Sequence, residues 1–252
     1  MLSCCWSAGS TRIHNVSVHL SANKKLEFFD LDISLSCPNG KMLVMIGPSG
    51  GGKTTIVRML AGLETPERGL ITFNDEVWFD SSRGINLPPR KRRLGYVFQD
   101  YTLFPHLNLF ENAAFAAVDR KEVDDLFELF GIGHLKDRKP YRVSGGERQR
   151  CAICQALARH PQLLLLDEPL SALDVVTRRE LREELKKLKE RISFPIIYVT
   201  HDINEALFLG DEILPVVNGR ADGDWIHRAI GGDSSTLSPS RAARAPRLAL
   251  AY

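Results

Sequence analysis

The sequence predicts an α/β fold with a mostly parallel β-sheet, and two observations support this prediction. Three short, continuous apolar runs at residues 42–46, 163–166 and 196–200 have the pattern of strands that are buried on both faces. The first two runs are each followed by a loop and then by a segment with helical periodicity. Strands that alternate with helices in this way build the parallel sheet of an α/β protein.

Other segments predict additions to this sheet. Apolar and polar residues alternate at residues 13–20, 26–35 and 70–80, which indicates half-buried strands and an N-terminal antiparallel β subdomain. Between about residues 100 and 155 apolar residues recur at helical spacing without a long strand, so we expect an inserted α-helical subdomain there.

The composition is that of a globular protein. The chain has 252 residues, of which 44% are hydrophobic and 25% charged, values that exclude fibrous, intrinsically disordered and integral-membrane classes. Lys and Arg (33) nearly balance Asp and Glu (31), which leaves a formal net charge of +2 and no overall case for nucleic acid as a partner. No apolar run approaches the roughly 20 residues that span a bilayer, and we expect no secretory signal.

The cysteine content indicates a reducing compartment. Five cysteines are an odd number for a disulfide framework, and Cys151 and Cys154 form a CxxC pair. A zinc or redox site is the alternative for this pair. Because no second pair or His cluster accompanies it, we interpret both residues as small apolar residues on one helix.

A glycine-rich loop after the first apolar run carries the strongest chemical signal. It matches G-x-x-x-x-G-K-[ST] and lies between a predicted strand and a predicted helix, as a phosphate-binding loop requires. Its glycines let backbone N–H groups and the helix N-terminus face a phosphate, while the lysine reaches the β- and γ-phosphates and the next hydroxyl can bind Mg²⁺. The predicted nucleotide-binding residues here are Gly47, Pro48, Ser49, Gly50, Gly51, Gly52, Lys53, Thr54 and Thr55.

Two acidic residues end the second apolar run. Asp167 and Glu168 would stand at the carboxyl edge of a parallel sheet, where ligands bind in such folds. We expect Asp167 to hold Mg²⁺ and Glu168 to polarise the water that attacks a γ-phosphate.

A third motif combines a helix cap with a candidate binding surface. Ser144 and Glu147 have the spacing of an S-x-x-E capping box, with Gly145 and Gly146 between them. A capped helix start with two small residues exposes N–H groups and the positive end of a helix dipole, so it can bind a phosphate that another subunit presents.

Together these motifs resemble the nucleotide-binding subunit of an ABC transporter, over about residues 13–220. GPSGGGKTT looks like Walker A, VSGGERQR like the ABC signature and LLLLDEP like Walker B, in the order of the family. Gln99 looks like the Q-loop glutamine, residues 171–174 (SALD) like the D-loop and His201 like the switch histidine.

The resemblance implies a catalytic mechanism. Two subunits would sandwich two ATP molecules, each between one subunit's phosphate loop and the other's Ser144 and Gly146. Glu168, His201 and Gln99 are then the catalytic candidates, with His201 on the γ-phosphate and Gln99 linking Mg²⁺ or water to the membrane partner. Thr54, Gln99 and Asp167 are the candidate Mg²⁺ ligands.

The segment at residues 78–115 resembles importer ATPases of the molybdate, sulfate, polyamine and sugar group, and most closely the molybdate type. This implies a cytoplasmic protein on the inner face of the membrane that works with permease subunits and a solute-binding protein. An importer of another solute is the alternative.

The chain departs from this group in three places. The usual adenine-stacking position falls near Lys24, which is not aromatic, so Phe28 and Phe29 remain candidates. Pro215 interrupts the expected final strand. Residues 221–252 are too few for the additional regulatory β domain of many relatives, and we expect a disordered tail there.

Two other function classes compete with the importer. An ABC ATPase that acts on DNA or the ribosome would usually carry coiled-coil insertions, a zinc module or two fused cassettes, and none is visible. A degenerate regulatory cassette would lack catalytic side chains that are present here. The basic run at residues 90–93 could indicate nucleic acid or anionic lipid, but we interpret it as a solvated loop.

Overall fold

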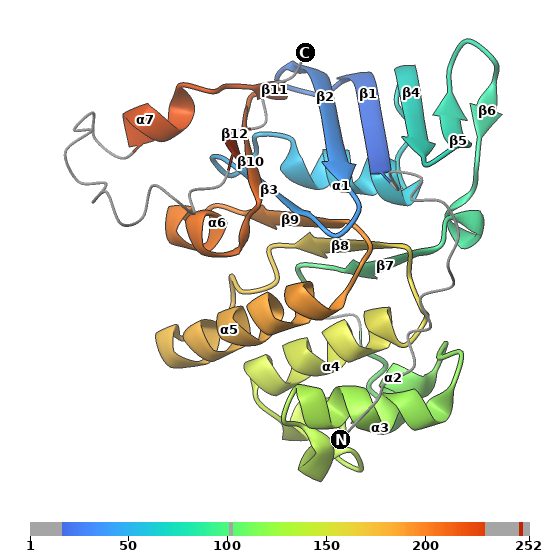
Figure 1. Ribbon diagram of the computed structural model, residues 1–252, viewed down its shortest axis with the longest axis vertical. Helices are drawn as coiled ribbons and strands as arrows, with labels where there is room; N and C mark the ends of the chain where they lie inside the picture. The colour runs from blue at the N-terminus through green and yellow to red at the C-terminus, as the bar shows by residue number, and fades with distance from the viewer. Residues whose placement is uncertain (1–16, 101–102, 230–246, 249–252) are drawn as a thin grey trace.

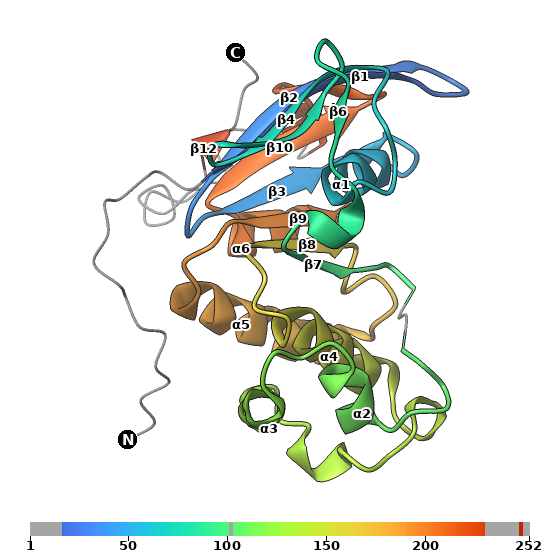
Figure 2. The same ribbon diagram turned by 90° about the vertical axis from the view of Figure 1, so that its right-hand side faces the viewer.

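The computed structural model describes residues 17–100, 103–229 and 247–248, which form an antiparallel sheet, a parallel sheet and a helical layer (Figure 1). Figure 2 shows helix α1 (Lys53–Ala61) between the two sheets, with the other long helices beyond the opposite face of the parallel sheet. These layers confirm the predicted α/β fold with a mostly parallel sheet.

The antiparallel sheet has the strand order β2-β1-β4-β5-β6. Its strands are β1 (Ser17–Lys25), β2 (Asp30–Pro38), β4 (Arg68–Phe73), β5 (Glu76–Asp80) and β6 (Ile85–Asn86). The single strand expected at residues 70–80 is wrong, because β4 and β5 form a hairpin. Asn74 has a positive φ of 53° in the turn between them, a conformation that asparagine tolerates better than most residues. Residues 13–16 lie outside the described part of the chain.

The second sheet has the order β11-β10-β3-β9-β8-β7, with β12 paired to β10. Its strands are β3 (Met42–Ile46), β7 (Leu94–Val97), β8 (Leu163–Asp167), β9 (Ile196–Thr200), β10 (Glu212–Val217), β11 (Arg220–Ala221) and β12 (Arg247–Leu248). All pairings are parallel except that of β10 with β11.

Strand β10 continues through Pro215, although the proline put this strand in doubt in the sequence. The orientation of Pro215 in the sheet explains why the strand is not interrupted. Asp222 N donates to the Pro215 carbonyl at 3.0 Å, so the backbone polar groups of Pro215 face away from β3. The missing N–H therefore lies on the side of the short strands β11 and β12 and removes no bond to β3.

The helices after α1 are α2 (Leu109–Ala114), α3 (Arg120–Leu129), α4 (Gly145–Leu157), α5 (Val175–Arg191), α6 (Ile203–Leu209) and α7 (Trp225–Ala229). Short 3₁₀ turns lie at Pro89–Lys91, Gly133–Leu135 and Pro140–Arg142. Helices α2, α3 and α4 occupy the segment where the helical subdomain was expected. Asn108 and Ser144 begin α2 and α4 with capping boxes, as the sequence predicts for Ser144.

The parallel sheet separates two apolar cores. Leu43 and Met45 face α1 and the antiparallel sheet, whereas Met42, Val44 and Ile46 face helices α2 to α6. All five are fully buried. This explains why β3 is a continuous apolar run, since both faces of a parallel strand lie in a core.

The two cysteines of the CxxC pair lie on α4, as expected. Both side chains are buried, and their sulfur atoms contact backbone carbonyls of α2 and α3, namely Leu109 O and Leu126 O. Burial raises the pKa of the Cys151 thiol to about 12, so this thiol stays protonated and acts as an apolar core group.

After β11 the structure describes helix α7 and strand β12. Helix α7 follows β11, and its Trp225 and Ile226 pack against the large core cluster. The expected disorder is therefore wrong for residues 221–229, because these two apolar side chains anchor the segment. The rest of the tail, apart from β12, lies outside the described residues.

The basic run at residues 90–93 is not a wholly solvated loop. Arg92 is only 4% exposed, and its guanidinium donates to the carbonyls of Met59 and Leu60 at 2.7 and 2.8 Å. It also lies over the ring of Trp78, 5.5 Å from the ring centroid. Arg92 thus satisfies carbonyls at the C-terminal end of α1 and complements the helix dipole.

Replacing Arg92 with alanine is expected to lower the free energy of unfolding by about 2–4 kcal/mol, because buried carbonyls lose charge-assisted hydrogen bonds and a cavity forms. Urea unfolding followed by circular dichroism measures the change. The matched control is Arg93→Ala, which removes an exposed arginine from the same loop. Equal midpoints for the two variants would contradict this role of Arg92.

Candidate functional site

The phosphate loop connects β3 to α1 and has the conformation that its glycines allow. Gly50 and Gly52 have φ values of 77° and 96°, which residues with a Cβ rarely adopt. A Cβ atom at Gly47 would lie 2.0 Å from the carbonyl oxygen of Val216 on β10. The loop therefore depends on glycine both for its turn and for its close approach to β10.

Lys53 begins α1 and points back into the loop. Its Nζ donates to the carbonyls of Gly47 and Pro48 at 2.9 and 2.8 Å, and the residue is only 4% exposed. Burial lowers the pKa of this ammonium, while the nearby carboxylates of Glu168 and Asp167 act in the opposite direction. The positive charge is thus held at the concave side of the glycine-rich loop.

Asp167 ends β8 beside α1. Its carboxylate oxygens accept from Thr54 Oγ1 and from Tyr96 Oη, both at 3.1 Å. Burial raises the pKa of Asp167, and the two hydroxyl donors lower it by a smaller amount. Tyr96 lies on β7, directly beside β8, and no sequence motif pointed to it; its place in the register opposite Leu165 is a property of the sheet.

Glu168 meets two side chains from neighbouring strand ends. Its Oε2 lies 3.4 Å from Nδ1 of His201, which follows β9, and accepts from Nε2 of Gln99, which follows β7, at 3.4 Å. Glu168 has a positive φ of 47°, a strained conformation for glutamate that a functional constraint commonly explains. The side chain is 14% exposed and that of His201 is 53% exposed, so the contact is open to a ligand.

These residues converge because β3, β9, β8 and β7 are adjacent parallel strands. The carboxyl ends of parallel strands share one edge, where α/β proteins bind ligands. The structure therefore brings together the predicted residues of the phosphate loop, Asp167, Glu168, Gln99 and His201.

The signature residues lie apart from this edge, at the start of α4 in the helical layer. Ser144 is exposed, and its hydroxyl accepts from Glu147 N at 3.3 Å. Gly146 is buried against α5, where a Cβ would lie 2.3 Å from Cγ2 of Thr177. Ser144 is thus accessible to another molecule, whereas Gly146 serves the close packing of α4 on α5.

The two candidate stacking aromatics differ in position. Phe28 is 87% exposed in the turn between β1 and β2. The ring of Phe29 lies against the phosphate loop, where a Cβ at Gly52 would be 3.4 Å from its Cε2. Phe29 is therefore the aromatic side chain that borders the loop.

The oxygen atoms at this edge fit Mg²⁺. Thr54 Oγ1 and Asp167 Oδ1 lie side by side, and hard oxygen donors are the ligands that Mg²⁺ prefers. Among the described residues no cluster of three or more His, Cys, Asp or Glu side chains could hold a metal. Mg²⁺ usually takes one or two protein ligands and completes its shell with phosphates and water.

The fold and the site define a phosphate-loop nucleotide-binding protein of the α/β class. The family described as ABC transporter matches residues 31–171, which is more than half of the chain. The chain belongs to this family.

Curated relatives from bacteria and archaea are import ATP-binding proteins. The chain is 43% identical over 212 residues to the molybdenum import ATP-binding protein ModC of Pseudomonas fluorescens, covering 82% of the chain and 59% of the relative. It is 41% identical to the sulfate/thiosulfate import protein CysA of Yersinia pestis (84% and 59% covered). It is 44% identical to the trehalose/maltose import protein MalK of Thermococcus litoralis (75% and 53% covered). The chain thus spans less than two thirds of the length of these relatives.

Solved structures show the same fold. A dimeric post-hydrolysis state of the ATP-binding cassette MJ0796, bound to ADP and Pi, superposes with a TM-score of 0.66 at 28% identity, covering 81% of this chain and 96% of that one. The cbiO1 subunit of an ABC transporter complex from Clostridium perfringens has a TM-score of 0.72 at 27% identity, with 82% and 87% covered.

Proposed function

We propose that this chain is the ATP-hydrolysing subunit of an ABC importer, and that it couples ATP binding and hydrolysis to the uptake of molybdate or a similar oxyanion. The observation that carries the proposal is the meeting of Glu168, His201 and Gln99 beside the phosphate loop, at the shared edge of four parallel strands. Such groups can orient the attacking water and accept its proton in phosphoryl transfer.

Each side chain has a defined task in this mechanism. Lys53 and the loop amides bind the β- and γ-phosphates. The phosphate oxygens then replace the two carbonyls that Lys53 contacts within its own loop. Glu168 accepts a proton from the attacking water, and His201 holds the γ-phosphate from the other side. Gln99 orients the attacking water or a metal ligand, and it links this site to the membrane partner.

Thr54 and Asp167, together with Gln99, would hold Mg²⁺. When bound, the ion would neutralise negative charge on the phosphates. Tyr96 keeps Asp167 in place through its hydroxyl, which leaves one carboxylate oxygen aimed at Thr54.

A second copy of the chain completes the site. Ser144 stands at an exposed helix tip, so it can contact a nucleotide that another molecule holds. Val175 and Val176, beside the 171–174 loop, are 82% and 67% exposed, which a contact with a second copy would explain. The dimeric cassette among the similar structures supports this arrangement.

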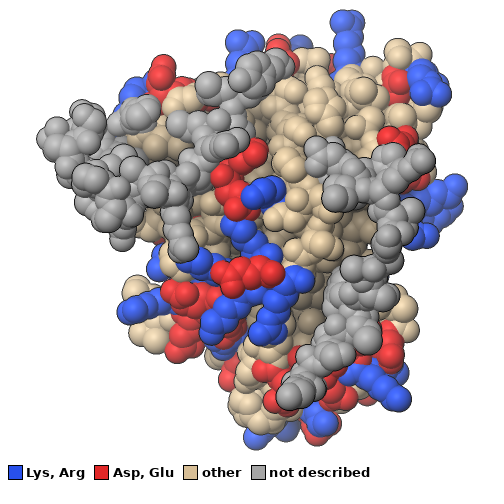
Figure 3. Space-filling view, in the orientation of Figure 1, with Lys and Arg blue, Asp and Glu red and all other residues tan. Residues whose placement is uncertain are grey.

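Permease subunits and a solute-binding protein are the remaining partners, and the inner face of the membrane is the proposed location. Among the described residues, no helix has both the length and the apolar character needed to cross a bilayer. The names of the relatives favour molybdate, with sulfate or sugars as the alternative solutes. Acidic and basic side chains are mixed over the face shown in Figure 3, which does not favour a polyanion such as nucleic acid.

The test is transport in proteoliposomes that contain the full chain and molybdate-type permease subunits. We expect ATP-dependent uptake of labelled molybdate that unlabelled molybdate or tungstate suppresses and sulfate does not. Uptake of sulfate or a sugar instead would assign the alternative solute. Copurification with nucleic acid and no membrane partner would contradict the importer itself.

A further inference from the structure

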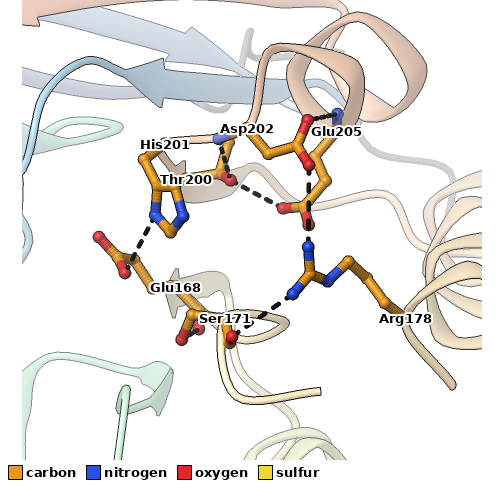
Figure 4. Close-up of a pocket in the computed structure, with 7 residues that line it drawn as sticks. All are labelled: Glu168, Ser171, Arg178, Thr200, His201, Asp202 and Glu205. Carbon is orange, nitrogen blue, oxygen red and sulfur yellow. Dashed lines mark hydrogen bonds and ion pairs between the residues drawn. The ribbon is translucent and has the colours of Figure 1, made fainter. Parts of the chain in front are cut away.

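One guanidinium connects the two loops that carry Glu168 and His201. Arg178 lies in the first turns of α5, and its side chain points into a small pocket between these loops (Figure 4). One terminal nitrogen donates to the Leu173 carbonyl at 3.0 Å and lies 3.5 Å from that of Ser171. The other terminal nitrogen faces Oδ2 of Asp202 at 4.0 Å.

The first of these loops is held on both sides. Ser171 N and Oγ donate to the Glu168 carbonyl at 3.2 and 2.9 Å, so the backbone after Glu168 is turned back on itself. Arg178 contacts the outward carbonyls of the same turn. The position of Glu168 therefore depends on this turn, which Arg178 ties to α5.

The second loop is held by a chain of hydrogen bonds around His201. Asp202 N donates to Thr200 Oγ1 at 3.0 Å, and Thr200 Oγ1 donates to the buried carboxylate of Glu205 at 2.7 Å. Asp202 also caps α6 through Asn204 N at 2.7 Å. Arg178 approaches this loop through Asp202, and it lines the same pocket as Thr200, His201 and Glu205.

The contacts of Arg178 contribute unequally to holding the two loops. Asp202 and Arg178 are both about a third exposed and 4.0 Å apart, so their ion pair contributes little by itself. The bonds to the two carbonyls are charge-assisted and fix the direction of the guanidinium plane.

We infer that Arg178 is a positioning residue that fixes the loop of Glu168 relative to the loop of His201. It touches neither side chain and acts through the carbonyls of residues 171 and 173 and through Asp202. We expect the 3.4 Å contact between Glu168 and His201 to loosen when Arg178 is replaced. The inference rests on the proposed ATP hydrolysis.

The first experiment is steady-state ATP hydrolysis by the full chain with Arg178→Ala, Arg178→Met and Arg178→Lys. We expect kcat to fall at least about 10-fold for Ala and Met with KM changed less than about 3-fold, because the phosphate loop is untouched. Lysine, which keeps the charge and one donor nitrogen, should restore part of kcat. The matched control is Arg179→Ala, the neighbouring exposed arginine on α5.

The second experiment measures the amide protection of the two loops directly and does not depend on ATP hydrolysis. Hydrogen exchange of the Ser171 and Asp202 amides should speed up about 10-fold in Arg178→Met and stay unchanged in Arg179→Ala. Unchanged exchange, or a kcat equal to that of the Arg179 control, would overturn the positioning role. A wild-type chain that hydrolyses no ATP while Arg178→Met still loses protection would overturn the proposed function alone.

Discussion

Replacing Glu168 with glutamine is expected to lower kcat for ATP hydrolysis by about 10³-fold while ATP binding is retained. Glutamine keeps the size of the side chain but cannot accept a proton, and general-base catalysis contributes about 10²–10⁴-fold. Because the Glu168 side chain contacts His201 and Gln99, and glutamine keeps its size, the phosphate contacts of the loop should survive. Phosphate release under saturating Mg-ATP measures the effect.

The control for this variant is Glu190→Gln, which neutralises an exposed glutamate on α5. It should hydrolyse ATP like the unaltered chain. Nucleotide titration with a fluorescent ATP analogue should give Glu168→Gln a Kd within about 3-fold of the unaltered chain. Normal turnover by Glu168→Gln would remove Glu168 from the role of base and leave His201 as the next candidate.

Replacing Lys53 with alanine is expected to raise the Kd for ATP by at least about 100-fold. Two charge-assisted hydrogen bonds to phosphate oxygens are lost, each worth about 1.5–3 kcal/mol. The ammonium is buried and already aimed into the loop, so no other cation can take its place without rearrangement. Isothermal titration calorimetry with ATP and Mg²⁺ measures the change.

Lys41→Ala is the matched control, because this exposed lysine precedes the same strand, β3, at the opposite end from the phosphate loop. It should bind ATP normally. A thermal melt without nucleotide checks that Lys53→Ala remains folded. An unchanged Kd in a folded Lys53→Ala chain would contradict phosphate binding by this loop.

The residues at the carboxyl edge of the parallel sheet could be predicted from the sequence, because each follows directly on a strand that the sequence itself reveals. A continuous apolar run identifies a buried parallel strand, and the residues that follow it must lie at the carboxyl edge of the sheet. Asp167 and Glu168 were placed in this way, and His201 through the family resemblance; in the structure Glu168 and His201 lie 3.4 Å apart. The capping box at Ser144 was predictable for the same reason, since its four residues are neighbours in sequence.

Other features depend on partners far away in the chain and were missed or predicted wrongly. Arg92 sits in a basic run typical of a solvated loop, but its partners are carbonyls about 32 residues earlier on α1. Tyr96 reaches Asp167, 71 residues away, only because β7 pairs with β8. Phe28 and Phe29 could not be separated, since alternation in a strand does not say which neighbour borders the phosphate loop.

The sequence by itself determined the class of protein, the order of its motifs and the chemistry of each side chain at the edge of the sheet. These properties follow from local periodicity and from residue types whose donors, acceptors and charges do not depend on context. Only the tertiary structure decided which arginines are buried, where β10 can accept Pro215 and how Arg178 joins two loops. Burial and hydrogen bonding between distant segments are set by sheet pairing and packing, which a single sequence does not encode position by position.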